Sequence, residues 1–104
     1  MYAICMDVID ILNQGDISFV SLGAKRGKAE LRAVDAHSRD VTDTLHPAMQ
    51  VSILSHLEEL LSGDGIVSFR RDDPALEHAF QGSEEAYLSA ASCLSDRLQQ
   101  TLFH

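Results

Sequence analysis

The sequence contains few of the residues that mark disulfide-bonded or metal-binding proteins. Its 104 residues include two cysteines, Cys5 and Cys93, and no tryptophan. Two cysteines are too few for a disulfide framework, and no CxxC spacing indicates zinc or redox chemistry. The simplest compartment for such a chain is the reducing cytoplasm, and we predict that location.

Long apolar runs and a secretion signal are also missing. No run of about 18 apolar residues is present to span a bilayer. The opening MYAICMDVIDIL is apolar, but it lacks a basic start and carries Asp7 and Asp10, which disfavours a signal peptide. We therefore expect neither membrane insertion nor secretion by the general route.

Basic residues are scarce, with eight Lys and Arg against sixteen Asp and Glu and a formal net charge of -8. Such a charge opposes general attraction to nucleic acid or anionic membranes. The imbalance is uneven along the chain. Positions 18–39 hold five basic and two acidic residues, whereas positions 40–69 hold five acidic residues and no Lys or Arg. We predict another protein with a basic surface as the partner, and a monomer or a homodimer.

Hydrophobic periodicity predicts one α+β domain over residues 1–104, with a largely antiparallel sheet covered by helices in the order α-β-β-α-β-α-α. The expected helices are 3–13, one from Pro47 that stops at Gly63, a short one from Pro74 through Phe80, and a last one capped by Ser83. The expected strands are 17–22, 30–33 and 66–69, and residues 35–46 are expected to form a surface loop.

The first two strands are expected to form a hairpin. Alternation places Ile17 and Phe19 on one face and Val20 and Leu22 on the other. The connection from Gly23 to Lys28 contains two glycines and suits a bulged or four- to five-residue loop with an exposed polar tip.

Motifs for metal binding or catalysis are weak. His37, Asp40, Asp43 and His46 share one loop, but their spacing matches no known metal cage, and we predict no metal and no cofactor. The serines lack a GxSxG turn, both cysteines fall on apolar helix faces, and GAKRGK is not followed by the GK[ST] of a phosphate loop. We therefore do not predict an enzyme.

Two charged surfaces remain as candidate sites. The basic tip consists of Lys25, Arg26 and Lys28. The acidic candidates are Asp40, Asp43, Glu58, Glu59, Asp64, Asp72, Asp73, Glu77, Glu84 and Glu85. An acidic field of this kind steers a protein toward basic clefts.

The leading hypothesis is a small non-enzymatic inhibitor that occupies the basic, nucleic-acid-binding cleft of a partner protein. Phage anti-defence proteins, including anti-CRISPR proteins, and antitoxin or immunity proteins are settings for such a chain. Two alternatives stay open. One is a nucleic-acid-binding module that uses the tip at 25–28, and the other is a secretion-type chaperone or homodimeric adaptor.

Overall fold

The computed structural model describes residues 2–14, 16–60, 63–77 and 84–102, and it has the predicted α+β architecture. The elements run α1 (Tyr2–Leu12), β1 (Ile17–Lys25), β2 (Lys28–Asp35), a 3₁₀ turn η1 (Thr42–Thr44), α2 (Pro47–Leu60), β3 (Gly65–Arg70), α3 (Pro74–Glu77) and α4 (Glu84–Thr101). The predicted end of the short helix at residues 78–80 and the predicted cap at residue 83 lie outside the described residues.

The three strands form one antiparallel sheet in the order β2-β1-β3. In the register, Leu22 of the central strand lies between Leu31 of β2 and Val67 of β3. Residues of one parity therefore point toward the helices, and residues of the other parity point away.

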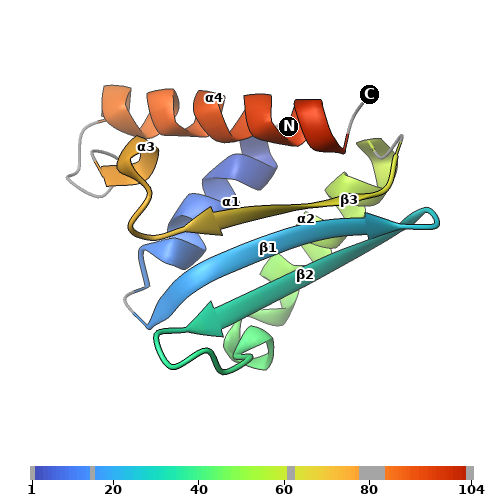
Figure 1. Cartoon of the computed structure of the whole chain (residues 1–104), viewed down its shortest axis with the longest axis horizontal. Coiled ribbons are helices and arrows are strands. Elements are labelled where there is room, and N and C mark those ends of the chain that lie inside the picture. Colours follow the sequence, from blue (N-terminus) through green and yellow to red (C-terminus); the bar gives the residue numbers. More distant parts are fainter. Residues whose placement is uncertain (1, 15, 61–62, 78–83, 103–104) are drawn as a thin grey trace.

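The long helices α1, α2 and α4 form a layer on one face of this sheet (Figure 1). α1 contacts the central strand β1, while α2 contacts β2 and α4 contacts β3. Val20, Leu22 and Phe69 from the sheet are fully buried against this layer. The predicted apolar stripes also enter the core, since Ile53 and Leu57 of α2 are fully buried. Within the described ranges, no helix is long and apolar enough to cross a membrane.

A bulge at the start of β1 changes which residues share a face. Ile17 pairs with Asp35 and Phe19 pairs with Val34, so two steps along β1 match one step along β2. The extra residue, Ser18, donates its hydroxyl to the carbonyl oxygens of Val34 and Asp35. Ile17 is consequently buried in the core while Phe19 lies on the opposite, half-exposed face. The prediction that Ile17 and Phe19 share a face was wrong, because simple alternation cannot reveal a bulge.

The hairpin turn is tighter than predicted. Lys25 pairs with Lys28, which leaves only Arg26 and Gly27 in the loop. Both have positive φ, 54° and 79°, as two-residue type I′ turns require. Gly23 instead lies within β1, paired with Glu30 on one side and Ile66 on the other. The backbone N–H of Arg26 donates to Oδ1 of Asp64 at 3.1 Å, and this bond ties the turn to the start of β3.

The segment after β2 is more ordered than the predicted surface loop. Asp40 forms an isolated bridge with Val34, and Thr42–Thr44 forms η1. The backbone N–H of Ala33 donates to the Thr42 hydroxyl, and the N–H of Val41 donates to the Ala33 carbonyl oxygen. Leu45 is buried. These contacts cover part of the outer edge of β2. Local sequence patterns did not predict that the segment following β2 would pack along this edge.

Two glycine substitutions test this account of the hairpin. Gly27→Ala puts a Cβ at φ 79° and is expected to lower the free energy of unfolding by about 1 kcal/mol. Gly23→Ala is the matched control, because its added Cβ would meet the nearest atom, Cγ1 of Ile66, at an ordinary 3.6 Å. Urea denaturation measures both. Equal destabilisation by the two substitutions would contradict the two-residue turn.

Candidate interaction surfaces

Basic residues are concentrated outside the helix layer, whereas acidic residues divide equally between the helices and the rest of the chain. Neither α1 nor α2 contains a Lys or Arg, and α4 contains only Arg97. The other basic residues of the chain belong to the strands or to the segments that join them: Lys25, Arg26, Lys28, Arg32, Arg39, Arg70 and Arg71. The helices hold eight of the sixteen acidic residues: Asp7, Asp10, Glu58, Glu59, Glu77, Glu84, Glu85 and Asp96. The other eight acidic residues lie outside the helices beside seven basic ones, so the helices are strongly negative while the rest of the chain is nearly balanced in charge.

The sheet face that points away from the helices is called the open sheet face here. Three cross-strand rows define it: Val34–Phe19–Arg70, Arg32–Ser21–Ser68 and Glu30–Gly23–Ile66. The same parity places Lys25 and Lys28 at its hairpin end. Within the strands this face thus holds four basic side chains and one acidic side chain, Glu30, while the Asp40 carboxylate reaches Arg32 from the segment after β2.

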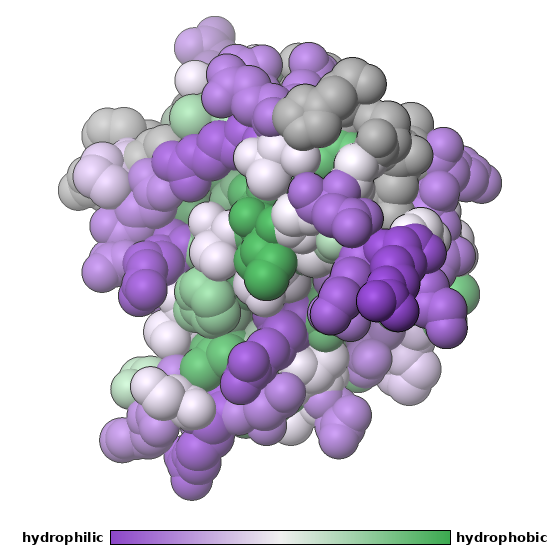
Figure 2. All heavy atoms as spheres, turned by 45° about the vertical axis from the view of Figure 1, so that its right-hand side comes forward, coloured by the Kyte–Doolittle hydropathy of each residue, from purple (hydrophilic) through white to green (hydrophobic). Residues whose placement is uncertain are grey.

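Apolar side chains interrupt the polar surface of the open sheet face. Ile66 is 71% exposed, and its Cγ1 lies 3.6 Å from where a Cβ on Gly23 would stand. The guanidinium carbon of Arg70 lies 5.4 Å from the centre of the Phe19 ring, within cation–π range. Figure 2 views this side obliquely and shows small hydrophobic patches among hydrophilic side chains.

The acidic centre of the helix layer lies on α1, between α2 and α4. The Tyr87 hydroxyl of α4 lies 3.0 Å from Oδ1 of Asp10 and 3.2 Å from the Met6 carbonyl oxygen, so it can donate to either. Burial, followed by the bond to Asp10, raises the pKa of Tyr87 to about 12. Burial and the Asp10 charge also raise the pKa of Asp7, while His56 of α2 opposes this rise. The half-buried Asp7 and the exposed Asp10 therefore both lie beside Tyr87.

The acidic residues predicted as a site do not gather in one place. Glu58 and Glu59 end α2, whereas Glu84 and Glu85 begin α4 at the opposite end of the molecule (Figure 1). All four side chains are exposed, as are those of Asp43 and Asp72. The side chain of Glu77 lies outside what the structure describes.

Three of the predicted acidic residues have structural partners. Asp64 accepts the hydrogen bond from the hairpin turn, and Oδ2 of Asp73 lies 2.7 Å from Nη1 of Arg97. Asp40 accepts from the backbone and the hydroxyl of Thr42, and these bonds lower its pKa, the hydroxyl contributing most. These carboxylates hold turns and helices in place as well as adding negative charge.

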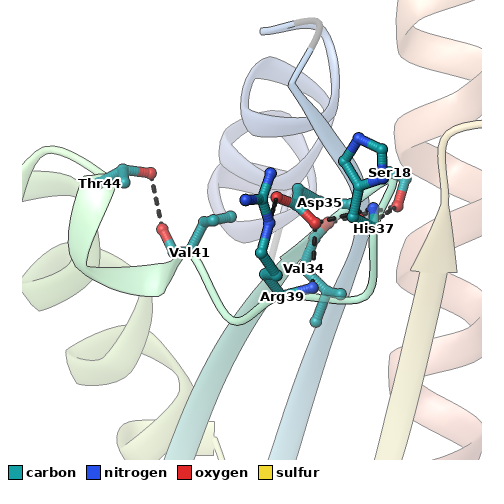
Figure 3. A network of polar contacts seen from close by, with 7 residues as sticks. All are labelled: Ser18, Val34, Asp35, His37, Arg39, Val41 and Thr44. Carbon is teal, nitrogen blue, oxygen red and sulfur yellow. Dashed lines mark hydrogen bonds and ion pairs between the residues drawn. The ribbon is translucent and has the colours of Figure 1, made fainter.

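A polar network closes the turn after β2 (Figure 3). Oδ1 of Asp35 accepts from the backbone N–H groups of His37 and Arg39, at 2.9 and 3.0 Å, and Oδ2 accepts from Nε of Arg39 at 2.9 Å. These bonds, with the Arg39 backbone first, lower the pKa of Asp35. The turn borders a pocket of about 560 Å³ that Gln14, Asp16 and Thr44 also line. The Asp35 oxygens are committed to the turn itself.

One of the two histidines of this loop bonds to the backbone through its ring. Nδ1 of His46 accepts from the N–H of Ala48 at the start of α2. In the part of the chain that the structure describes, no three His, Cys, Asp or Glu side chains gather into a possible metal site. Cys5 is fully buried, and burial raises the pKa of its thiol to about 11.

Sequence reasoning missed two groups of surface residues. Arg32 and Arg70 join the hairpin lysines on the open sheet face, and strand parity would have revealed this once the pairing of β1 with β3 was known. The Asp7–Asp10 pair lies beside Tyr87, 77 positions from Asp10, and no local pattern could have brought them together.

Comparisons of the chain with protein-family models, curated proteins and solved structures found no match.

The Asp35 turn predicts a specific dependence of stability on pH. Because folding lowers the Asp35 pKa below its ordinary 3.8, its contribution is fully present above that value and is lost as the pH falls through the folded-state pKa. The melting temperature of Asp35→Asn should therefore lie below that of the wild type at neutral pH, and the gap should narrow below about pH 4. Asp43→Asn, an exposed carboxylate in the same loop, is the control. A gap that stays constant down to pH 2 would contradict this role.

Proposed function

We propose that the protein is a non-enzymatic inhibitor that binds another protein through its helix layer and occupies a basic, nucleic-acid-binding cleft. A phage anti-defence role, as for anti-CRISPR proteins, or an antitoxin or immunity role fits this activity. The observation that carries the proposal is the excess of negative charge on the helices, which hold eight acidic residues and no Lys or Arg except Arg97 of α4. A surface of one sign steers association with a surface of the other and disfavours wrong partners.

The end of α2 adds a second line of support. Glu58 and Glu59 are exposed in the last turn of this helix. Negative charges there oppose the helix dipole at a cost of about 0.3–1 kcal/mol each. Helix stability therefore does not explain them, whereas contact with a basic partner does.

The proposal includes cytoplasmic action. The two cysteines are free, and Cys5 is buried in its thiol form, which suits a reducing compartment. Nucleic-acid binding by the hairpin tip and a chaperone or adaptor role remain alternative predictions.

Displacement of nucleic acid tests the inhibitor. Purified proteins with basic nucleic-acid-binding clefts are each loaded with fluorescein-labelled DNA and titrated with the wild-type protein, and DNA release is followed by fluorescence anisotropy. For a true target we expect release that requires more protein as salt rises. Glu58→Lys should require about tenfold more protein than the wild type. Its melting temperature should not fall, because a lysine suits the end of a helix.

Asp16→Lys is the matched control, since it makes the same change in net charge at an exposed residue outside the helices. It should release DNA nearly as well as the wild type. If DNA release weakened equally in both variants, the effect would be due to the net charge of the protein and not to the position of Glu58. Failure to displace DNA from any protein of the panel would overturn the proposed function.

A further inference from the structure

We propose that the open sheet face is a second interaction surface, which binds an acidic polypeptide segment of a partner protein. This face lies on the opposite side of the sheet from the helices, so the inference stands independently of the function proposed for the helix layer (Figure 1). It rests on three observations: the sign of the charge on this face, its exposed apolar group Ile66 and the short side chains in the middle of its central strand.

Charge on the open sheet face is complementary to carboxylates. Lys25, Lys28, Arg32 and Arg70 are all exposed there, and the strands place one acidic residue, Glu30, among them. Arg32 lies 3.5 Å from Oδ2 of Asp40, but both side chains are more than half exposed, at 61% and 54%. An exposed pair of this kind is weak, and Arg32 can exchange it for a partner carboxylate.

The middle of this face has short side chains on its central strand. Ser21 lies beside Ser68 of β3, while Gly23 is buried and its position for a Cβ is 3.6 Å from Cγ1 of Ile66. The Phe19–Arg70 pair lies at one end of the face and the hairpin lysines lie at the other. Ile66, 71% exposed, offers an apolar contact between them.

A polypeptide fits this surface better than a nucleic acid does. The net charge of -8 repels the dense phosphate charge of a nucleic acid at long range. Base stacking needs an accessible aromatic ring, and Arg70 already lies over the Phe19 ring. A protein partner, by contrast, would bury Ile66 and engage Arg70, and both arginine and aromatic residues are enriched at protein interfaces.

A second copy of the chain fits less well. Two open sheet faces brought together would oppose Arg32 and Arg70 with the same residues, and like charges repel. Placing this face against the helix layer of another copy pairs opposite charges. Each added copy then leaves one unpaired sheet face and one unpaired helix layer at the ends of the assembly, which gives an open chain of subunits. An acidic segment of a different protein pairs with the basic residues of this face without like-charge repulsion and without open-ended assembly.

Peptide binding tests the inference. The probe is a fluorescein-labelled peptide of about ten residues in which Glu alternates with Leu and Val, long enough to follow a strand such as β1. Anisotropy should report a dissociation constant below about 100 μM. Replacing every Glu of the peptide by Lys should abolish binding. In ¹⁵N-labelled protein, amide shifts should concentrate at Ser21, Gly23 and Ser68 and leave the outer helix surface unchanged.

Matched variants locate the binding surface. Arg32→Glu and Arg39→Glu each reverse an exposed arginine that is paired with an aspartate, and only Arg32→Glu should weaken the peptide, by about tenfold. Ile66→Ala should weaken it several-fold, whereas Val51→Ala, an exposed apolar residue of α2, should not. Circular dichroism confirms that each variant is folded.

The competing occupants give distinct results. Tighter binding of oligo-dT than of the acidic peptide, lost in Arg32→Glu, would replace the inference with nucleic-acid binding. Concentration-dependent growth in mass by light scattering, also lost in Arg32→Glu, would replace it with self-association. Absence of peptide binding, equal binding of the Lys peptide, or equal losses in Arg32→Glu and Arg39→Glu would overturn it. DNA displacement by the helix layer is unaffected by any of these outcomes.

Discussion

A three-stranded sheet that is covered on one face only is the constraint on which the rest of the structure depends. The central strand β1 buries Val20 and Leu22 beneath the helices, and burial of such side chains provides most of the free energy of folding. The opposite face must remain stable in water. That requirement is met by Ser21, Ser68 and the charged residues around them. Ile66 does not help to meet it, because it is an apolar side chain that remains exposed to water.

The same constraint separates the charges. Helices α1, α2 and α4 turn their apolar stripes toward the sheet, so their polar residues can only face solvent on the far side. Because those residues include almost no Lys or Arg, the outer surface of the helices is negative. The strands hold four of the eight basic residues, and alternation directs Arg32 and Arg70 away from the core. A bias that began as uneven composition along the chain thus becomes a difference between two faces.

Much of this fold could be predicted from local sequence patterns. Periodicity located α2 because proline begins it and a regular apolar stripe follows, and the parity of β3 follows from Val67 and Phe69. The bulge at Ser18 was missed because it depends on side-chain bonds to Val34 and Asp35, which are distant in sequence. The two-residue turn was missed because Arg26 accepts an unusual positive φ, and its N–H is bonded to Asp64, 38 positions away. Contacts of this range leave no local signal.

The candidate surfaces were predictable to a lesser degree, for a related reason. Sequence indicated the negative charge of Glu58 and Glu59, but it could not distinguish exposed carboxylates from those that hold the chain together. Asp64, Asp40 and Asp73 each bond to a group within the protein, whereas Glu58 and Glu59 lie exposed where the helix dipole disfavours them. A charge that is kept at some cost to local stability is better evidence of binding than a charge that stabilises a turn. By this criterion the end of α2, and the open sheet face with its exposed Ile66, are the stronger candidates for interaction surfaces.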